Sequence, residues 1–348
     1  MPASPIHSIH ESLGAKLVEF AGWMMPVHYT GVIEEHEAVR DRCGIFDVSH
    51  LGRFRLEGPE TISILDRELC NDAAGLSDGR AQYTMALNDV GGVVDDIIVW
   101  RRSATAAWVM PNGVNHDRVL ARFADAAADV VATDARADTA LFAVQGPTAP
   151  DVLSAVLNEV PGRFRCIETQ AGDADVAAAG TGYTGERGAE LIVPTEHAAS
   201  VWQALVDAGA QPCGLGSRDT LRLEMGYPLW GQDLDESTTP LEAGLEWVVS
   251  WDHDFVGKNA LVDQREAGPS RRLVGFTTGS RRIARAGSRM RAGSAVGTVT
   301  SGNFSPILGQ GIGVGYLAGD DSSGALEVEI RGEWHSVERS KPPFVDVG

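Results

Sequence analysis

Apolar and polar residues alternate in short segments along this chain, and glycine-rich turns separate the segments. The clearest pair is AQYTMAL at 81–87 and VVDDIIVW at 93–100, which lie on either side of the sequence NDVGG. Two apolar runs around a short turn of this composition predict a β-hairpin. The same kind of pattern predicts further strands at 105–112 and 139–147.

Other segments have the apolar spacing or the end signals of helices, and these lie at 31–44, 59–69, 114–127, 196–208 and 214–226. The fourth of them carries an apolar stripe made of Ala199, Val201, Trp202, Leu205 and Val206. The fifth is expected to begin at Ser217. Residues 16–30 mix aromatic side chains with a glycine and a proline, which predicts an irregular segment packed on a core.

The pattern changes near residue 272, where short strands separated by dense glycine turns begin. Glycine makes up 40 of 348 residues, about 11% against a typical value of roughly 7%, which indicates many turns. We therefore expect the tail to form a separate small antiparallel barrel or sandwich. GQGIGVG at 309–315 fits a strand of this tail better than a dinucleotide-binding loop, because no strand-to-helix unit surrounds it.

The formal net charge of −19 argues against a nucleic-acid partner, whose phosphates would need many Lys and Arg contacts. One stretch contrasts with this acidity, since it holds seven arginines and no acid: Arg271, Arg272, Arg281, Arg282, Arg285, Arg289 and Arg291. We call these residues the arginine cluster. It is either a solvated loop or a docking face for an anionic ligand or an acidic partner.

Cysteine and histidine spacing gives no sign of a metal site or a disulfide framework. The four cysteines stand far apart, and His7 and His10 form the one histidine pair at a ligand-like spacing, so we expect reduced cysteines and no metal. The first residues lack the basic and apolar regions of a signal peptide, and no run of 18 apolar residues occurs. The expected location is the cytoplasm.

The stretch GTGYTGERGAEL at 180–191 combines a glycine-rich turn with the start of an apolar strand. Gly182, Gly185 and Gly188 are expected to allow positive φ and a close approach to a flat ligand. Strand alternation then places Ala189 and Leu191 on one face and Glu190 on the other. The stretch is either a hairpin with a solvated glutamate or a binding corner with one carboxylate.

Asp95 and Asp96 interrupt the apolar strand 93–100, and alternation sends their side chains to opposite faces. One of the two must therefore point toward a core or a cleft. Carboxylates are seldom fully buried without partners. The pair either contains a structural aspartate bonded to backbone N–H groups or places a carboxylate where it can accept or stabilise a proton on a reacting nitrogen.

Many segments together closely resemble the aminomethyltransferase family of the glycine cleavage system, the T-proteins. The matching runs include LGAKLVEFAGWMMPVHY, AVRDRCGIFDVSH, GGVVDDIIV, TGYTGERGAEL, GLGSRDTLRLEMGYPLWGQDLDESTTPLEAGL and TSGNFSPILG. They follow the family order over roughly residues 8 to 309.

This resemblance implies an α+β fold with three domains arranged around a folate cavity. Residues 1–265 would form two intertwined α+β domains, and residues 266–348 would form a C-terminal β-barrel domain. The implied reaction takes the one-carbon unit from the aminomethylated lipoyl arm of H-protein, releases ammonia and forms 5,10-methylenetetrahydrofolate. Tetrahydrofolate is then a co-substrate, H-protein is the partner, and neither a metal, a membrane nor a nucleic acid takes part.

The family's functional residues carry over by motif. Asp96, the second residue of the DD pair, corresponds to the catalytic aspartate, Glu190 to the acid that binds the pterin, and Arg218 to an arginine that contacts the folate. Three further residues fall at positions that line the family's cavity, namely Tyr83, Asn112 and Tyr183. A pterin edge offers adjacent N–H donors, which one carboxylate can accept together, and the planar fork of an arginine suits anionic or carbonyl oxygens.

The chain departs from the family pattern at several positions. Gly180 stands where the family commonly has Arg, Arg187 reverses a charge in the TGEDG motif, Leu51 and Arg53 replace Met and Glu, and Trp230 replaces Tyr. None of these changes removes the carried-over residues, although Arg187 bears on affinity or substrate choice.

Two other activities stay open from the sequence. Relatives with this architecture act as folate-dependent demethylases of sulfonium, methoxy or N-methyl substrates. Others are noncatalytic or RNA-maturation folate-binding proteins, which typically carry a KGCxxGQE-like motif that this chain lacks.

Overall fold

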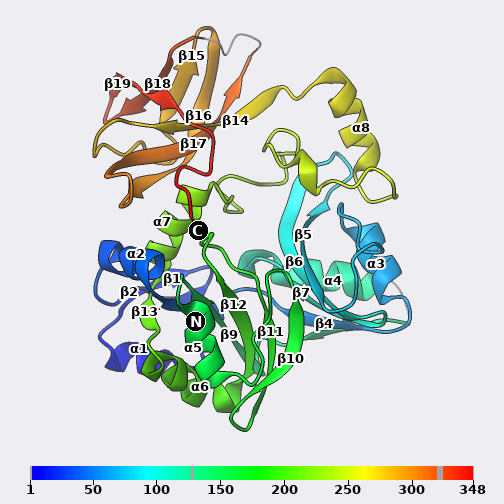
Figure 1. The fold of residues 1–348 in the computed structure, drawn as a ribbon. Coiled ribbons are helices and arrows are strands. Elements are labelled where there is room, and N and C mark those ends of the chain that lie inside the picture. Colours follow the sequence, from blue (N-terminus) through cyan, green and yellow to red (C-terminus); the bar gives the residue numbers. More distant parts are fainter. Residues whose placement is uncertain (1, 127–128, 320–323, 348) are drawn as a thin grey trace. The chain divides into compact units, whose positions relative to one another are not determined.

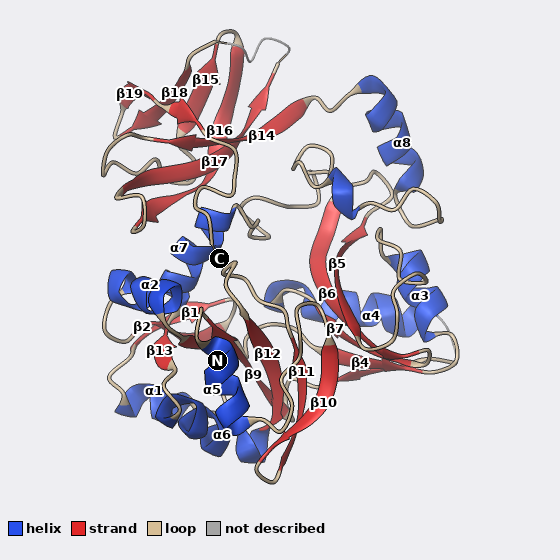
Figure 2. Ribbon diagram, in the orientation of Figure 1, coloured by secondary structure: helices blue, strands red, loops and turns tan. Residues whose placement is uncertain are grey.

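The computed structural model describes residues 2–126, 129–319 and 324–347, coloured along the sequence in Figure 1. The chain divides into two compact units that interleave along the sequence. Unit 1 contains residues 1–84, 96–218 and 347–348, and unit 2 contains residues 85–95 and 219–346. Mixed helices and strands build the molecule (Figure 2), as expected for an α+β protein.

A six-stranded sheet forms the centre of unit 1, in the order β10-β11-β12-β9-β3-β13. Its strands are β3 (Gly44–Asp47), β9 (Thr139–Gln145), β10 (Cys166–Ala171), β11 (Ala174–Ala179), β12 (Gly188–Pro194) and β13 (Gln211–Cys213). Neighbours pair antiparallel except for β13, which runs parallel to β3. The sheet therefore has its long strands β9 and β12 side by side at its middle.

One face of this sheet packs against α5 (Ala149–Val156) and α6 (Thr195–Asp207). Phe142 of β9 and Trp202 of α6 meet edge to face, with ring centroids 5.3 Å apart, inside the main apolar cluster. The predicted stripe of α6 is largely confirmed, because Val201, Trp202 and Leu205 are buried and Val206 is half-buried. The assignment of Ala199 to the apolar stripe was wrong, because Ala199 is exposed and Ala198 is buried in its place.

The predicted hairpin at 81–100 is confirmed within a second sheet, ordered β5-β6-β7-β4-β8. Its strands are β4 (Phe54–Glu57), β5 (Arg80–Leu87), β6 (Val93–Ser103), β7 (Ala106–Met110) and β8 (Val131–Asp134). The helices α3 (Thr61–Glu68) and α4 (His116–Ala126) follow β4 and β7 in the chain. Residue 127, the last of the expected helix 114–127, lies outside the described residues.

The C-terminal part of unit 2 is a seven-stranded sheet in the order β19-β18-β15-β16-β17-β14-β20. Its strands are β14 (Arg271–Thr277), β15 (Arg289–Ala292), β16 (Ala295–Ser305), β17 (Gln310–Ala318), β18 (Leu326–Ile330), β19 (Glu333–Ser336) and β20 (Glu338–Arg339). All of its pairings are antiparallel. Side chains from five of these strands share one core, so the sheet curls on itself as a half-barrel. The antiparallel tail and the assignment of GQGIGVG to a strand are confirmed.

The remaining helices are α1 (His7–Ser12), α2 (Val32–Asp41), α7 (Leu215–Met225) and α8 (Lys258–Ala267), with single 3₁₀ turns at η1 (Gly113–Asn115) and η2 (Glu246–Val248). The helix α7 begins at Leu215, before the expected Ser217, whose hydroxyl bonds the carbonyl of Gly214. None of the helices within the described ranges combines the length and apolar character that crossing a membrane requires.

Residues 16–30 are not irregular, contrary to the prediction from sequence. They form an antiparallel hairpin of β1 (Lys16–Phe20) and β2 (Trp23–His28). The two turn residues Ala21 and Gly22 have φ of 50° and 79°. Positive φ at both central positions is the geometry of a tight hairpin turn that usually takes Asn-Gly. Because alanine occupies the first of these positions, the turn cannot be recognised from the sequence.

Candidate active site

The strand β6 separates its two aspartates as the alternation predicts. Asp95 is fully buried along with Val93, Ile97 and Val99, whereas Asp96 is half-buried. The face that carries Asp96 is therefore the more accessible one. This difference makes Asp96, and not its neighbour, the carboxylate available to a ligand.

Asp96 is held by Tyr83 and Asn112, two of the residues that the resemblance implies to line a cavity. The Tyr83 hydroxyl, on the adjacent strand β5, donates to Oδ2 of Asp96 over 3.0 Å. The Asn112 amide, at the start of η1, donates to Oδ1 over 2.8 Å and to the backbone oxygen of Asp96 over 3.2 Å. Each carboxylate oxygen thus has a neutral donor, which fixes the orientation of the group.

The surroundings of Tyr83 keep its hydroxyl protonated, so that it can always donate a hydrogen bond. Burial raises its pKa well above 10, and the Asp96 and Tyr183 side chains raise the pKa further. The phenol is therefore protonated throughout the physiological range.

Glu190 lies on β12 with the geometry expected from the strand alternation. Ala189 and Leu191 belong to the main apolar cluster, and Glu190, which is 7% exposed, pairs across the sheet with Ala143 and Ala179. These two alanine neighbours offer the carboxylate neither a polar group nor a countercharge. A buried carboxylate in such a position needs a polar partner.

The loop before β12 takes positive φ at Gly185 (85°) and Gly188 (150°), as predicted. The expectation of positive φ was wrong for Gly182, which is absent from the left-handed region. Its glycine has a steric cause instead, because a Cβ atom there would lie 1.9 Å from Oε1 of Gln145. Sequence alone showed that a glycine was needed but not which of the two reasons applied.

Arg218, on α7, lies over the ring of Tyr183, with the guanidinium carbon 4.8 Å from the ring centroid. Its Nη1 atom is buried and has no hydrogen-bond partner within the described ranges. Burial lowers the pKa of Arg218, while nearby Glu190 and Tyr183 oppose the shift. A buried cationic donor without an acceptor is costly. This atom is therefore suited to receive an acceptor from a ligand.

The sequence assigned no role to His50, a buried side chain next to this group. Burial, followed by the charge of Arg218, lowers the pKa of His50 to about 3, so the imidazole is neutral near pH 7. Its Nδ1 atom also lacks a hydrogen-bond partner among the residues described. The DVSH segment gave the one available signal, since its histidine comes shortly after the buried strand β3 ends at Asp47, but burial could not be read from it.

The six residues assigned from sequence lie within unit 1, where they form two groups. Asp96 with Tyr83 and Asn112 forms a fixed carboxylate, and Glu190 with Arg218 and Tyr183 forms a second group with a planar face. Within the described ranges, no cluster of three or more His, Cys, Asp or Glu side chains could hold a metal ion. The four cysteines are all described by the structure; they are buried and form no disulfide with one another.

Comparison of the sequence with known protein families identifies the family of this chain. Residues 6–253 match the family described as "GCVT N-terminal domain", and residues 271–346 match "Glycine cleavage T-protein C-terminal barrel domain". The chain belongs to the glycine cleavage T-protein family. Members of this T-protein family are aminomethyltransferases that use tetrahydrofolate as a substrate.

Several curated T-protein relatives are similar over nearly their whole length. The chain is 44% identical to the aminomethyltransferase of Rubrobacter xylanophilus over 336 residues, which covers 94% of this chain and 90% of the relative. It is 41% identical to the aminomethyltransferase of Halothermothrix orenii, with 99% of this chain and 100% of the relative covered. The expected family is confirmed by these matches.

A solved structure supports the fold as well. The glycine cleavage system aminomethyltransferase T from Bartonella henselae superposes with a TM-score of 0.91 at 32% sequence identity. The match covers 99% of this chain and 98% of that one. The predicted T-protein fold class is therefore confirmed.

Proposed function

We propose that this T-protein family member transfers the one-carbon unit of aminomethylated dihydrolipoyl H-protein to tetrahydrofolate, releasing ammonia and forming 5,10-methylenetetrahydrofolate. The observation that carries the proposal is the Asp96 carboxylate, held at both oxygens by Tyr83 and Asn112. A second group in the same unit, Glu190 with Arg218, has chemistry that suits a folate.

Glu190 recognises the pterin in this proposal. Its carboxylate accepts the adjacent ring N–H and amino donors of the pterin edge, which two oxygens of one group can bind together. The flanking alanines of β9 and β11 offer no polar group that competes with this contact. The unpartnered Nη1 of Arg218 binds a carbonyl or carboxylate oxygen of the same ligand.

Asp96 supplies a fixed negative charge to the reacting nitrogen. As a carbon–nitrogen bond forms to a secondary amine, that nitrogen becomes cationic and must lose its proton. A carboxylate fixed by neutral donors stabilises this cation and can accept the proton without reorganising. Tyr83 and Asn112 position Asp96 for this role through their hydrogen bonds. Because both donors are neutral, they do not neutralise the negative charge of Asp96.

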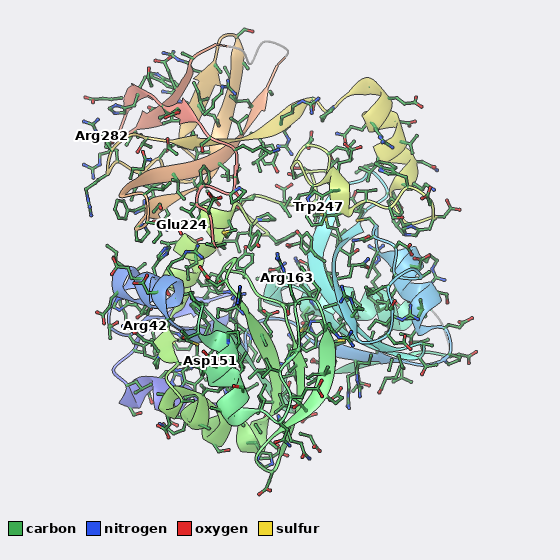
Figure 3. The ribbon with its side chains drawn as sticks, viewed as in Figure 1. Arg42, Asp151, Arg163, Glu224, Trp247 and Arg282 are labelled. Carbon is green, nitrogen blue, oxygen red and sulfur yellow. The ribbon has the colours of Figure 1, made fainter. Side chains whose placement is uncertain are left out.

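We propose that Arg281, Arg282 and Arg285 of the arginine cluster bind an acidic face of H-protein. Three other members of the cluster already pair with acids of unit 2, in Arg271–Glu242, Arg289–Glu329 and Arg291–Glu327. Arg281, Arg282 and Arg285 are exposed, and no acid within 4.0 Å of them is found among the residues described. Figure 3 labels Arg282 at the edge of the seven-stranded sheet.

The domain boundary near residue 265 also belongs to the proposal. The second family match begins at residue 271, where the strand β14 of the half-barrel starts, and this supports residues 266–348 as a C-terminal domain. The helix α8 (Lys258–Ala267) then leads into that domain. The relatives favour aminomethyl transfer over the alternative of a folate-dependent demethylase.

A direct assay tests the proposed reaction. The purified protein is incubated with tetrahydrofolate and aminomethylated H-protein, and ammonia is measured with and without tetrahydrofolate. We expect ammonia and 5,10-methylenetetrahydrofolate in equal amounts, with the rate dependent on tetrahydrofolate. Absence of both products, together with methyl transfer to tetrahydrofolate from a sulfonium, methoxy or N-methyl donor, would support the demethylase instead.

A further inference from the structure

The loop between β11 and β12 is fixed to the sheet by Gln145, which is fully buried at the end of β9. The amide Nε2 of Gln145 donates to the Thr181 carbonyl over 3.1 Å. The Thr184 hydroxyl in turn donates to Oε1 of Gln145 over 3.0 Å. One amide therefore holds the loop at two positions, and Gly182 lies against it where any side chain would collide.

A buried ion pair holds the next part of the same loop. Arg40 of α2 donates to the Thr184 carbonyl over 2.8 Å and contacts Glu186 over 2.9 Å. Both charged side chains are 5% exposed. Buried, fully bonded polar networks of this kind fix one conformation. The position of Thr181 is consequently set by the scaffold and not by the ligand.

The fixed Thr181 meets Glu190. Its hydroxyl donates to Oε2 of Glu190 over 2.6 Å, and both side chains are 7% exposed. Within the described residues, this hydroxyl is the hydrogen-bond donor to the carboxylate, and Oε1 receives none. The cross-strand neighbours Ala143 and Ala179 offer no polar group. The orientation of the Glu190 carboxylate thus depends on Thr181.

We propose that Thr181 is a positioning residue for folate binding: its hydroxyl, held through Gln145, fixes the Glu190 carboxylate with Oε1 open to a ligand. The inference rests on the proposed function, in which Glu190 binds the pterin edge. A glutamate that is already ordered loses less side-chain entropy when the ligand binds. Thr181 therefore acts on the affinity for tetrahydrofolate and not on the chemistry at Asp96.

The test measures tetrahydrofolate binding and steady-state kinetics in matched variants. Thr181→Val removes the hydroxyl at nearly constant shape, and Thr181→Ser keeps it. Thr169→Val is the control, because Thr169 is a buried threonine of β10 whose hydroxyl bonds the Glu159 N–H instead. Thr181→Ala also removes the hydroxyl and serves as the second variant if Thr181→Val does not fold.

We expect Thr181→Val to raise the Kd and the KM for tetrahydrofolate about 10-fold, with kcat within 2-fold of wild type. Thr181→Ser and Thr169→Val should stay within 3-fold in Kd. In a Glu190→Gln background, Thr181→Val should raise the Kd for tetrahydrofolate by less than a further 2-fold, because the carboxylate that Thr181 positions is no longer present.

Two results would overturn the inference. One is an unchanged Kd in folded Thr181→Val or Thr181→Ala while Glu190→Gln binds weakly. The other is a full 10-fold effect of Thr181→Val in the Glu190→Gln background. A wild-type protein that does not bind tetrahydrofolate would instead remove the proposed function itself, so the two failures are distinguishable.

Discussion

The Tyr83 hydroxyl donates to Oδ2 of Asp96 over 3.0 Å, so these two residues of the neighbouring strands β5 and β6 form a single donor–acceptor unit. Asn112 completes the unit at the other carboxylate oxygen. The hairpin and the start of η1 thus present a carboxylate that is fixed before any ligand arrives. This preorganisation is the structural basis for assigning Asp96 to the chemical step.

Replacing Tyr83 with Phe removes the hydroxyl that donates to Oδ2 of Asp96 while keeping the ring. A hydrogen bond to a charged group contributes about 1.5 to 3 kcal/mol, so we expect kcat for aminomethyl transfer to fall about 10-fold or more. Steady-state kinetics with saturating tetrahydrofolate measures this. Tyr29→Phe is the matched control, since its hydroxyl bonds His10 away from Asp96. Equal losses of kcat in both variants would contradict the assignment.

Glu190→Gln should reduce the stabilisation of the fold by tetrahydrofolate. A ligand at about 100 times its Kd adds roughly 2.7 kcal/mol to the free energy of unfolding. The amide places a donor against donors of the pterin, which costs about 1 to 3 kcal/mol. Thermal melts with and without tetrahydrofolate measure the change, with Glu168→Gln on β10 as the control. A full ligand-induced shift in Glu190→Gln would remove the pterin assignment.

His50 makes the stability of the protein depend on pH. Its pKa is about 3 in the folded protein and 6.5 in its ordinary state, because burial and Arg218 disfavour the charged imidazole. Below pH 6.5 the unfolded chain therefore binds a proton that the folded chain does not. The contribution of His50 to stability is present above pH 6.5 and is lost as the pH falls, by about 1.4 kcal/mol per pH unit toward pH 3.

The measurement is the free energy of unfolding from pH 7 to pH 4 in wild type and in His50→Gln. We expect the variant to have a slope smaller by about 1.4 kcal/mol per pH unit below pH 6.5, whatever its absolute stability. Parallel curves for the two proteins would show that His50 is charged in the folded state or exposed to water.

The three arginines that have no acidic partner among the described residues, Arg281, Arg282 and Arg285, are expected to affect only the binding of H-protein. Replacing Arg281, Arg282 and Arg285 with Ser should raise the KM for aminomethylated H-protein several-fold and flatten its salt dependence, because steering between opposite charges weakens as salt screens them. The control replaces Arg289 and Arg291, whose guanidinium groups are paired with Glu329 and Glu327. Unchanged kinetics across a salt series would identify the cluster as a solvated loop.

Strand alternation predicted much of this site correctly. The opposite faces of Asp95 and Asp96, and of Ala189 and Glu190, follow from a period of two that local sequence already contains. The hairpin at 81–100 was visible because its turn has the usual composition. In contrast, the β1–β2 turn at Ala21 and Gly22 was missed, since alanine rarely takes positive φ.

The contacts between distant segments could not be predicted from the pattern. The bond from Thr181 to Glu190 and the hold of Gln145 on the same loop depend on how β9, β11 and β12 pair. Burial of His50 likewise depends on elements far from it in sequence. Local periodicity places a side chain on a face, but long-range pairing decides what that face meets.

The most direct test compares Asp96→Asn with Asp95→Asn in the ammonia-release assay. Asn keeps the volume and one acceptor oxygen of Asp but loses the charge and the basicity. Loss of a positioned acid–base group typically lowers the rate by about 10² to 10⁴. Asp95 is fully buried on the opposite face of β6 and provides the matched control.

We predict that Asp96→Asn folds normally, binds tetrahydrofolate, and releases ammonia from aminomethylated H-protein at least 100-fold more slowly than wild type. Asp95→Asn should lower the melting temperature while the folded protein keeps its turnover within a few-fold, since its buried carboxylate serves the fold. A folded but inactive Asp95→Asn alongside near-normal turnover in Asp96→Asn would contradict the account and assign the reaction to the other face of the strand.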